Sequence, residues 1–127
     1  MTATLRVLLA DDYAGLLKTY RRLLEPPHQI IGCLTEGDAV VAAARSLRPD
    51  VIVLDFAMPG LNGIDACRQI RQLCPESRVV LVTAADDAVT VQAASEAGAA
   101  AFVSTYRAAD GLVQVIERVC AVKASVR

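Results

Sequence analysis

The sequence predicts an α/β domain in which one parallel sheet of five strands is covered by helices on both faces. Five short apolar runs alternate along the 127 residues with segments of helical periodicity, and the connections between them are short. The apolar runs are nearly continuous rather than alternating, which is typical of parallel strands buried on both sides. Hydrophobic residues make up 54% of the chain, so we expect a single domain over residues 1–127 with a large core.

The third apolar run is the clearest strand, and it ends at a candidate functional residue. It spans residues 50–55, where four apolar residues lead directly into Asp55, and a Pro-Gly pair and an Asn-Gly pair then break the chain. The carboxyl ends of parallel strands form the sheet edge at which such domains bind ligands. We therefore predict that Asp55 belongs to a functional site.

The four remaining apolar runs are also expected to be strands. They span residues 5–10, 28–34, 79–82 and 100–104. Asp11 and Asp12 directly follow the run at 5–10, and Thr83 directly follows the run at 79–82. The lone His28, at the start of the second run, is expected to be solvated and is assigned no role.

Helical segments fill the spaces between these strands. Apolar residues recur at helical spacing over residues 16–24, 38–47, 64–73, 86–97 and 112–123. Prolines follow the first three of these segments, as expected where a helix must end. Asn62 is predicted to cap the third helix with Asp65 as its partner, and Gly98 is predicted to terminate the fourth. In the last helix the residues expected to face outward are Glu117, Arg118 and Lys123.

Right-handed crossovers restrict the order of the strands in such a sheet. The common five-stranded order is 2-1-3-4-5, the doubly wound, flavodoxin-like arrangement, in which the first and third strands are neighbours. Asp11, Asp12 and Asp55 are then expected at one edge of the sheet. An alternative is that Asp11 and Asp12 only cap the helix that follows them, but this leaves Asp55 and Thr83 unexplained.

Three carboxylates gathered at one edge repel one another. Each pair ~4 Å apart costs about 1 kcal/mol in water and about 4 kcal/mol at an effective dielectric constant near 20. Such a cluster normally binds a cation, and an all-oxygen set of ligands with room for water suits Mg²⁺. With Thr83 placed to donate its hydroxyl to an anion at the metal, the set indicates phosphoryl transfer to an aspartate nucleophile.

Composition and charge argue against several other functions. The net charge of −1 provides no basic surface for nucleic acid, and no apolar run approaches the roughly 18 residues of a membrane span. No glycine-rich phosphate-binding motif is present, which disfavours a nucleotide or flavin enzyme on this fold. The widely spaced cysteines are expected to be buried free thiols in a cytoplasmic protein. Val89, Val91 and Val113 are expected to serve the core rather than a dimer.

Short motifs in a fixed order cover nearly the whole chain. They are Ala10-Asp11-Asp12, Arg48-Pro49-Asp50-Val51, Leu54-Asp55 followed by Met58-Pro59-Gly60 and Gly63, Val82-Thr83-Ala84, and Gly98-Ala99 before Phe102. With these motifs the sequence resembles the response-regulator receiver domains of two-component signalling. The spacing is most similar to the NarL/FixJ type, which precedes a LuxR-type helix-turn-helix output domain.

The resemblance implies a role for each matching residue. Asp55 would accept a phosphoryl group from a histidine kinase, and Thr83 would hydrogen-bond that group. Mg²⁺ would be held by Asp11, Asp12, Asp55 and the backbone carbonyl of Ala57. The surface of the fourth helix, fifth strand and fifth helix would then re-pack against a partner or a second copy. The chain would be a signalling domain, excised from a longer cytoplasmic regulator with a DNA-binding domain, rather than an enzyme acting on a separate substrate.

One position departs from the pattern of the family. Phe102 would take the place of the switch aromatic, and three residues later, where receivers carry a lysine that pairs with the phosphoryl oxygens, this chain has Thr105. Replacing a charge-assisted hydrogen bond of about 1.5–3 kcal/mol by a neutral one of about 0.5–1.5 kcal/mol weakens the phosphorylated state. Arg107 is a less favoured surrogate. The alternative function is therefore an atypical receiver that docks or dimerises without phosphorylation.

Overall fold

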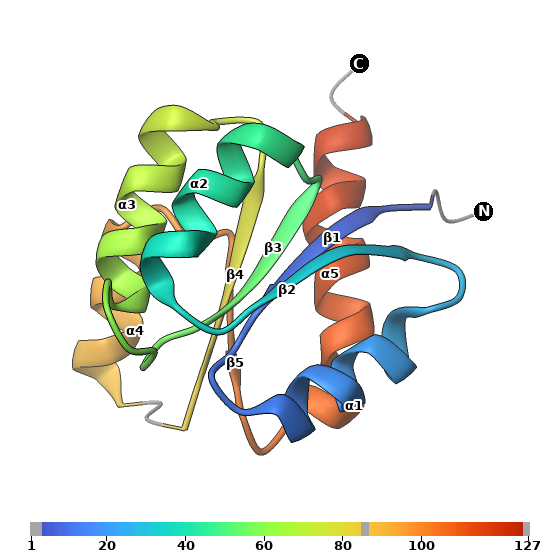
Figure 1. Ribbon diagram of the computed structural model, residues 1–127, viewed down its shortest axis with the longest axis horizontal. Coiled ribbons are helices and arrows are strands. Elements are labelled where there is room, and N and C mark those ends of the chain that lie inside the picture. The colour runs from blue at the N-terminus through green and yellow to red at the C-terminus, as the bar shows by residue number, and fades with distance from the viewer. Residues whose placement is uncertain (1–3, 85–86, 126–127) are drawn as a thin grey trace.

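The computed structural model describes residues 4–84 and 87–125. Within these residues, five strands form one parallel sheet in the order β2-β1-β3-β4-β5, which confirms the predicted flavodoxin-like fold (Figure 1). The strands are β1 Arg6–Ala10, β2 Gln29–Leu34, β3 Val51–Asp55, β4 Arg78–Thr83 and β5 Ala101–Ser104. Each strand begins and ends within one residue of its predicted bounds.

Helices cover both faces of this sheet. They are α1 Ala14–Leu24, α2 Gly37–Leu47, α3 Gly63–Leu73, α4 Ala88–Glu96 and α5 Ala108–Ser125. Figure 1 shows α1 and α5 on one face and α2, α3 and α4 on the other. In the part of the chain that the structure describes, no helix is both long and apolar enough to cross a membrane.

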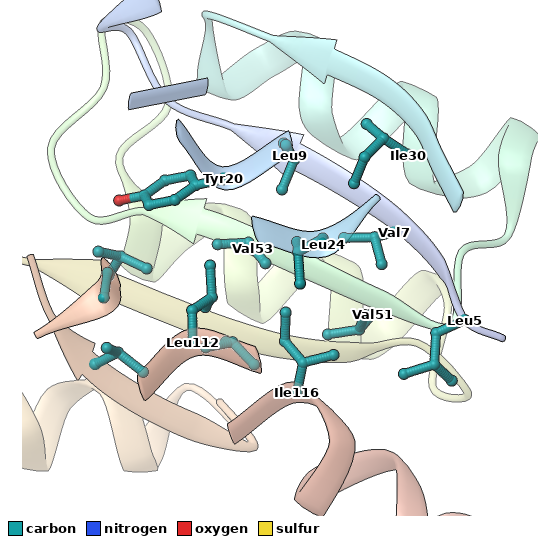
Figure 2. Close-up of a cluster of buried hydrophobic side chains, with 14 of the residues drawn as sticks. Leu5, Val7, Leu9, Tyr20, Leu24, Ile30, Val51, Val53, Leu112 and Ile116 are labelled. Carbon is teal, nitrogen blue, oxygen red and sulfur yellow. The ribbon is translucent and has the colours of Figure 1, made fainter. Parts of the chain in front are cut away.

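The sheet divides the core into two layers because successive residues of a strand point to opposite faces. Leu9 and Val53 pack beneath α1 and α5, together with Tyr20 from α1 (Figure 2). Ile52 packs into the second layer, beneath α2, α3 and α4. Residues of β1 and β3 pack in both layers along the length of each strand, and this burial fixes the positions of the residues at the ends of the two strands.

The ends of two helices follow the predicted signals. Asn62 caps α3 by accepting a hydrogen bond from the backbone N–H of Asp65 (3.0 Å), and its amide donates to the Asp65 carboxylate (3.1 Å). Asp87 caps α4 in the same way, through the N–H three residues later (2.8 Å). Gly98 follows α4 with φ +93°, a left-handed conformation that favours glycine. Asp86, which was also predicted in this helix, lies outside the described residues.

The prediction that His28 is solvated is wrong, because this side chain is buried (3% exposed). Its Nδ1 accepts a hydrogen bond from the N–H of Leu5 (3.1 Å), and its Nε2 lies 2.9 Å from Oε2 of Glu117 on α5. Since Nδ1 accepts, the ring carries its proton on Nε2, and this N–H donates a hydrogen bond to Glu117. Glu117 was expected to face outward and is instead this partly buried partner; Arg118 is exposed as expected, and the side chain of Lys123 is not among those described.

The expectation of four buried thiols holds for three of them. Buried free thiols are found at Cys67, Cys74 and Cys120, whereas Cys33 is exposed. Cys33 lies on β2, which is an edge strand of the sheet and has a neighbour on one side only. An edge strand presents part of its length to solvent, so the apolar sequence around Cys33 does not ensure burial.

The assignment of Val89 and Val91 to the core is also wrong. These side chains are 79% and 40% exposed. Both lie on α4, in which Ala94 is the only buried residue among those described. Val113 of α5 packs against the core as expected. Val89 and Val91 therefore belong to an exposed surface of α4 rather than to the interior.

Candidate functional site

Three aspartates lie together at the carboxyl ends of two neighbouring strands. Asp55 is the last residue of β3, and Asp11 and Asp12 directly follow β1. The two strands pair in parallel with Ala10 opposite Leu54, so the residues that follow reach the same edge. One carboxylate oxygen of each aspartate lies within 4.8 Å of those of the other two. The structure thus brings together the three carboxylates that the sequence places at one edge.

The three carboxylates differ in exposure and in hydrogen bonding. Asp11 is buried (2% exposed), Asp55 is partly buried and Asp12 is exposed. Oδ1 of Asp11 accepts a hydrogen bond from the N–H of Tyr13 (2.9 Å), and Oδ1 of Asp55 accepts a longer one from the N–H of Ala57 (3.4 Å). Among the described residues, no ion pair includes any of the three aspartates.

Burial and mutual repulsion favour the protonated forms of these groups. Burial, followed by the negative charge of Asp11, raises the pKa of Asp55 from 3.8 to about 7, and the N–H of Ala57 offsets only part of this rise. Burial also raises the pKa of Asp11, opposed by the N–H of Tyr13 and assisted by the charge of Asp12. Full ionisation of the cluster is therefore unfavourable unless a cation compensates the charge.

The donor set fits a small divalent cation. Every side-chain ligand is a carboxylate oxygen, the type that Mg²⁺ prefers. Oxygens around an octahedral Mg²⁺ are at most about 4.2 Å apart, because each lies about 2.1 Å from the ion. The observed spread of up to 4.8 Å is only slightly wider than this limit. Ala57 presents its N–H to Asp55, and the role of its carbonyl as a further ligand stays a prediction.

Thr83 and Thr105 lie side by side at the ends of the next two strands. Thr83 is the last residue of β4, is buried (4% exposed) and pairs with Ser104 of β5. The N–H of Thr105 donates to the carbonyl of Thr83 (2.8 Å). This bond continues the sheet pairing by one residue, so Thr105 is held at the same edge as the aspartates. Thr105 is thus a neutral hydroxyl residue at this edge, and its equivalence to the lysine of the family pattern stays a prediction.

Phe102 lies away from this edge, within β5. It packs against the core layer beneath α2, α3 and α4 and is partly exposed. Its ring helps to line a shallow groove of about 360 Å³ between α4 and α5, together with Val91 and Arg107. Arg107 thus lies on this groove and forms no ion pair with the aspartates in the described part of the chain.

Tyr20 is a neighbour of the site. From the sequence alone, it is only one of the residues on the apolar face of the helix predicted over residues 16–24. Its side chain is 2% exposed, and among the described residues its hydroxyl has no hydrogen-bond partner. Burial, then the negative charges of Asp11 and Asp55, raises the pKa of Tyr20 to about 12. The available signal was the residue type itself, because a tyrosine on a buried helical face carries a hydroxyl that needs a partner.

Comparison with known proteins identifies the family. Residues 7–117 match the family model described as the response regulator receiver domain. The chain belongs to this family. Relatives within the family include the DNA-binding response regulator MtrA of Mycolicibacterium paratuberculosis.

Individual relatives support the same assignment. The response regulator GacA of Pseudomonas aeruginosa is 30% identical over 119 residues, which are 92% of this chain and 56% of GacA. The chemotaxis protein CheY of Thermotoga maritima is 30% identical over 99 residues, or 77% of this chain and 82% of CheY. A LuxR-family response regulator from Aurantimonas has a crystal structure that superimposes with a TM-score of 0.89 at 31% identity, covering 94% of this chain and 87% of that one. The receiver described here thus spans about half the length of GacA.

Proposed function

We propose that this receiver accepts a phosphoryl group on Asp55 from a histidine kinase, with Mg²⁺ held by Asp11, Asp12, Asp55 and the carbonyl of Ala57. The observation that carries the proposal is the convergence of three carboxylates within 4.8 Å at one sheet edge, where no protein cation neutralises them among the described residues. A divalent cation bound there supplies charge neutralisation for the carboxylates and for the incoming phosphoryl oxygens.

Each residue of the site has a separate task in the proposed reaction. A carboxylate oxygen of Asp55 attacks the phosphorus atom, the phosphorus–nitrogen bond of the phosphohistidine breaks, and the electron pair of that bond leaves on the imidazole nitrogen. Asp55 suits this task because β3 holds its backbone rigidly while its side chain stays partly exposed. The hydroxyl of Thr83 donates to a phosphoryl oxygen. The domain modifies only itself and acts on no separate substrate.

The proposal also includes the partners of the domain. Phosphorylation re-packs the surface of α4, β5 and α5, where Val89 and Val91 are exposed beside the groove lined by Phe102. This surface contacts a second copy or an output domain. A DNA-binding output domain in a longer, cytoplasmic protein is supported by the LuxR-family relative and by the 56% share of GacA that the match covers.

A second candidate function is favoured by Thr105. A receiver without a cation at this position has less to stabilise the phosphoryl oxygens. The exposed residues of α4 are available for docking whether or not Asp55 is phosphorylated. In this candidate the fold serves as a constitutive module for binding a partner or a second copy.

The test is intact mass spectrometry after incubation with a small phosphodonor and Mg²⁺. The wild-type chain is expected to gain about 80 Da, one phosphoryl group in place of a hydrogen. Asp55→Asn is expected to gain nothing, and Asp110→Asn, which removes an exposed carboxylate on α5, is expected to behave as wild type. An adduct that persists in Asp55→Asn would contradict the assignment of Asp55. A wild-type chain that takes up no phosphoryl group would favour the second candidate.

A further inference from the structure

Tyr20 lies directly behind the acidic site. Its ring packs in the core layer beneath α1 and α5 with Leu9 and Val53. Figure 2 shows the hydroxyl oxygen pointing beyond Leu9 and Val53, toward the end of the sheet to which β1 and β3 run. Two residues after Leu9 and Val53 come Asp11 and Asp55, whose side chains point to the same face of the sheet. The hydroxyl is therefore aimed at the acidic site from its buried side.

This hydroxyl has no partner among the described residues, although Tyr20 is only 2% exposed. Buried hydroxyls are nearly always hydrogen-bonded, because losing contact with water without compensation is unfavourable. The charges that act on this hydroxyl are those of the Asp11 and Asp55 carboxylates, which only accept hydrogen bonds. The pKa of about 12 means that the phenol keeps its proton throughout the physiological pH range and stays a donor.

The acidic site needs more hydrogen-bond donors as its negative charge increases. Three carboxylates and one divalent cation carry a net charge of about −1, and converting the Asp55 carboxylate to a phosphoryl dianion makes it about −2. Among the described residues, the hydrogen-bond donors to these carboxylates include two backbone N–H groups, those of Tyr13 and Ala57. Metal-ligating carboxylates are normally held by hydrogen bonds from surrounding residues, and removing such a bond typically weakens metal binding.

We propose that Tyr20 is a positioning residue of this site, whose hydroxyl donates a hydrogen bond to the Asp11 carboxylate when the site takes up a divalent cation and a phosphoryl group. Asp11 is the acceptor in this proposal because, like Tyr20, it is buried (2% exposed). Its charge acts on Tyr20 more strongly than that of Asp55. The Tyr13 N–H donates to Oδ1 of Asp11, and because each carboxylate oxygen has two lone pairs, Asp11 can accept from Tyr20 and also bind the cation. This inference rests on the proposed function.

The test compares wild type with Tyr20→Phe, which keeps the ring and removes only the hydroxyl. Tyr20→Phe is expected to bind Mg²⁺, and the phosphoryl mimic beryllofluoride in the presence of Mg²⁺, about tenfold more weakly. Its metal-free melting temperature is expected to be equal to or higher than that of wild type, because the lost hydroxyl has no partner there. Tyr106→Phe is the matched control, since that side chain is 80% exposed, and is expected to behave as wild type.

A spectroscopic measurement separates positioning from packing. The chain has three tyrosines and no tryptophan, so the difference in emission between wild type and Tyr20→Phe reports Tyr20. A new hydrogen bond to a carboxylate changes this emission, and the change is expected to follow the same Mg²⁺ titration curve as binding. Equal Mg²⁺ affinities, or a Tyr20 emission that ignores Mg²⁺, would overturn the inference while leaving the proposed function intact. A wild-type chain that binds neither Mg²⁺ nor beryllofluoride would overturn both.

Discussion

Polar groups at the two ends of the sheet differ in whether they have partners within the chain. At the amino end, His28 bridges the N–H of Leu5 and the carboxylate of Glu117. The N–H of Arg6 donates to Asp50 at 2.8 Å. These groups have partners within the chain, whereas the buried Nε of Arg78, at the start of β4, has none among the described residues. At the carboxyl end, three carboxylates lie within 4.8 Å of one another with no ion pair among the described residues.

The difference separates stability from function. Satisfied polar contacts at the amino end tie β1, β2 and α5 together and need nothing from outside the chain. At the carboxyl end, the repulsion between carboxylates and the unpartnered hydroxyl of Tyr20 are unfavourable in the domain alone. Under the proposed function, a bound cation offsets the repulsion, and the hydrogen bond to Asp11 gives the hydroxyl an acceptor. We therefore expect changes at the amino end to lower stability without altering ligand binding, and changes at the carboxyl end to do the reverse.

The largest effect is expected from His28→Ala. This change opens a cavity, leaves the N–H of Leu5 without its acceptor and removes the partner of Glu117. We expect the free energy of unfolding, measured with urea, to fall by about 3 kcal/mol. The Mg²⁺ affinity of the folded protein is expected to stay unchanged, because His28 lies at the opposite end of the strands.

Glu117→Gln is the matched control for the amino end. It keeps the shape of the side chain and a hydrogen-bond acceptor, so the loss is expected to be smaller, about 1 kcal/mol. If His28→Ala were as stable as wild type, or if it weakened Mg²⁺ binding, the division between the two ends would be incorrect.

The fold was predictable because local signals along this chain agree with one another. Four apolar residues before Asp55 define β3, and Asn62 and Gly98 mark helix ends in the structure as they do in the sequence. The failures fall on residues whose environment is set by distant parts of the chain. His28 finds its partners 23 and 89 residues away, and the exposure of Cys33 follows from the edge position of β2.

The acidic cluster was predictable for a different reason. Asp11 and Asp55 end strands that the strand order makes neighbours, so topology alone brings them together. Tyr20 was not predictable as a neighbour of this site, because helical periodicity indicates which face a residue occupies but not which way its hydroxyl points. Figure 2 supplies that direction. The exposure of Val89 likewise depends on how little of α4 is buried, which periodicity does not reveal.

The second largest effect is expected in the pH dependence of metal-free stability. Asp55 has a pKa of about 7 in the folded protein and 3.8 as its usual value. Between these values the folded state holds the proton more tightly, so this contribution to stability is full below pH 3.8 and is lost as the pH rises through 7. We expect the unfolding free energy without divalent ions to fall from pH 4 to pH 8 by about 2 kcal/mol, half the fully buried value because Asp55 is partly exposed.

Asp55→Asn isolates this contribution. The variant has no proton to lose at this position, so its stability in EDTA is expected to fall less than that of wild type between pH 4 and pH 8. Asp110→Asn should keep the wild-type slope, since its carboxylate is exposed to solvent. Saturating Mg²⁺ should flatten or reverse the wild-type slope, because the ion competes with the proton for Asp55. If the unfolding free energies of wild type and Asp55→Asn changed equally with pH, the pKa of Asp55 would not be raised in the folded protein.

The smallest effect is expected from Thr105→Lys, which supplies the carboxyl end with a cation of its own. Thr105 is held beside Thr83 at the sheet edge, so a lysine there can reach the phosphoryl oxygens. We expect beryllofluoride affinity to rise about tenfold, equivalent to about 1.4 kcal/mol. Mg²⁺ affinity in the absence of the mimic should fall, because the ammonium group repels the incoming ion. Thr105→Met adds length without charge and should change neither affinity.

A tenfold gain from the lysine would show that the carboxyl end is limited by uncompensated charge. Equal affinities in all three proteins would show that the metal and the hydroxyls of Tyr20 and Thr83 already stabilise the phosphoryl oxygens. Thr105 would then have no part in the choice between a phosphorylated switch and a constitutive docking module.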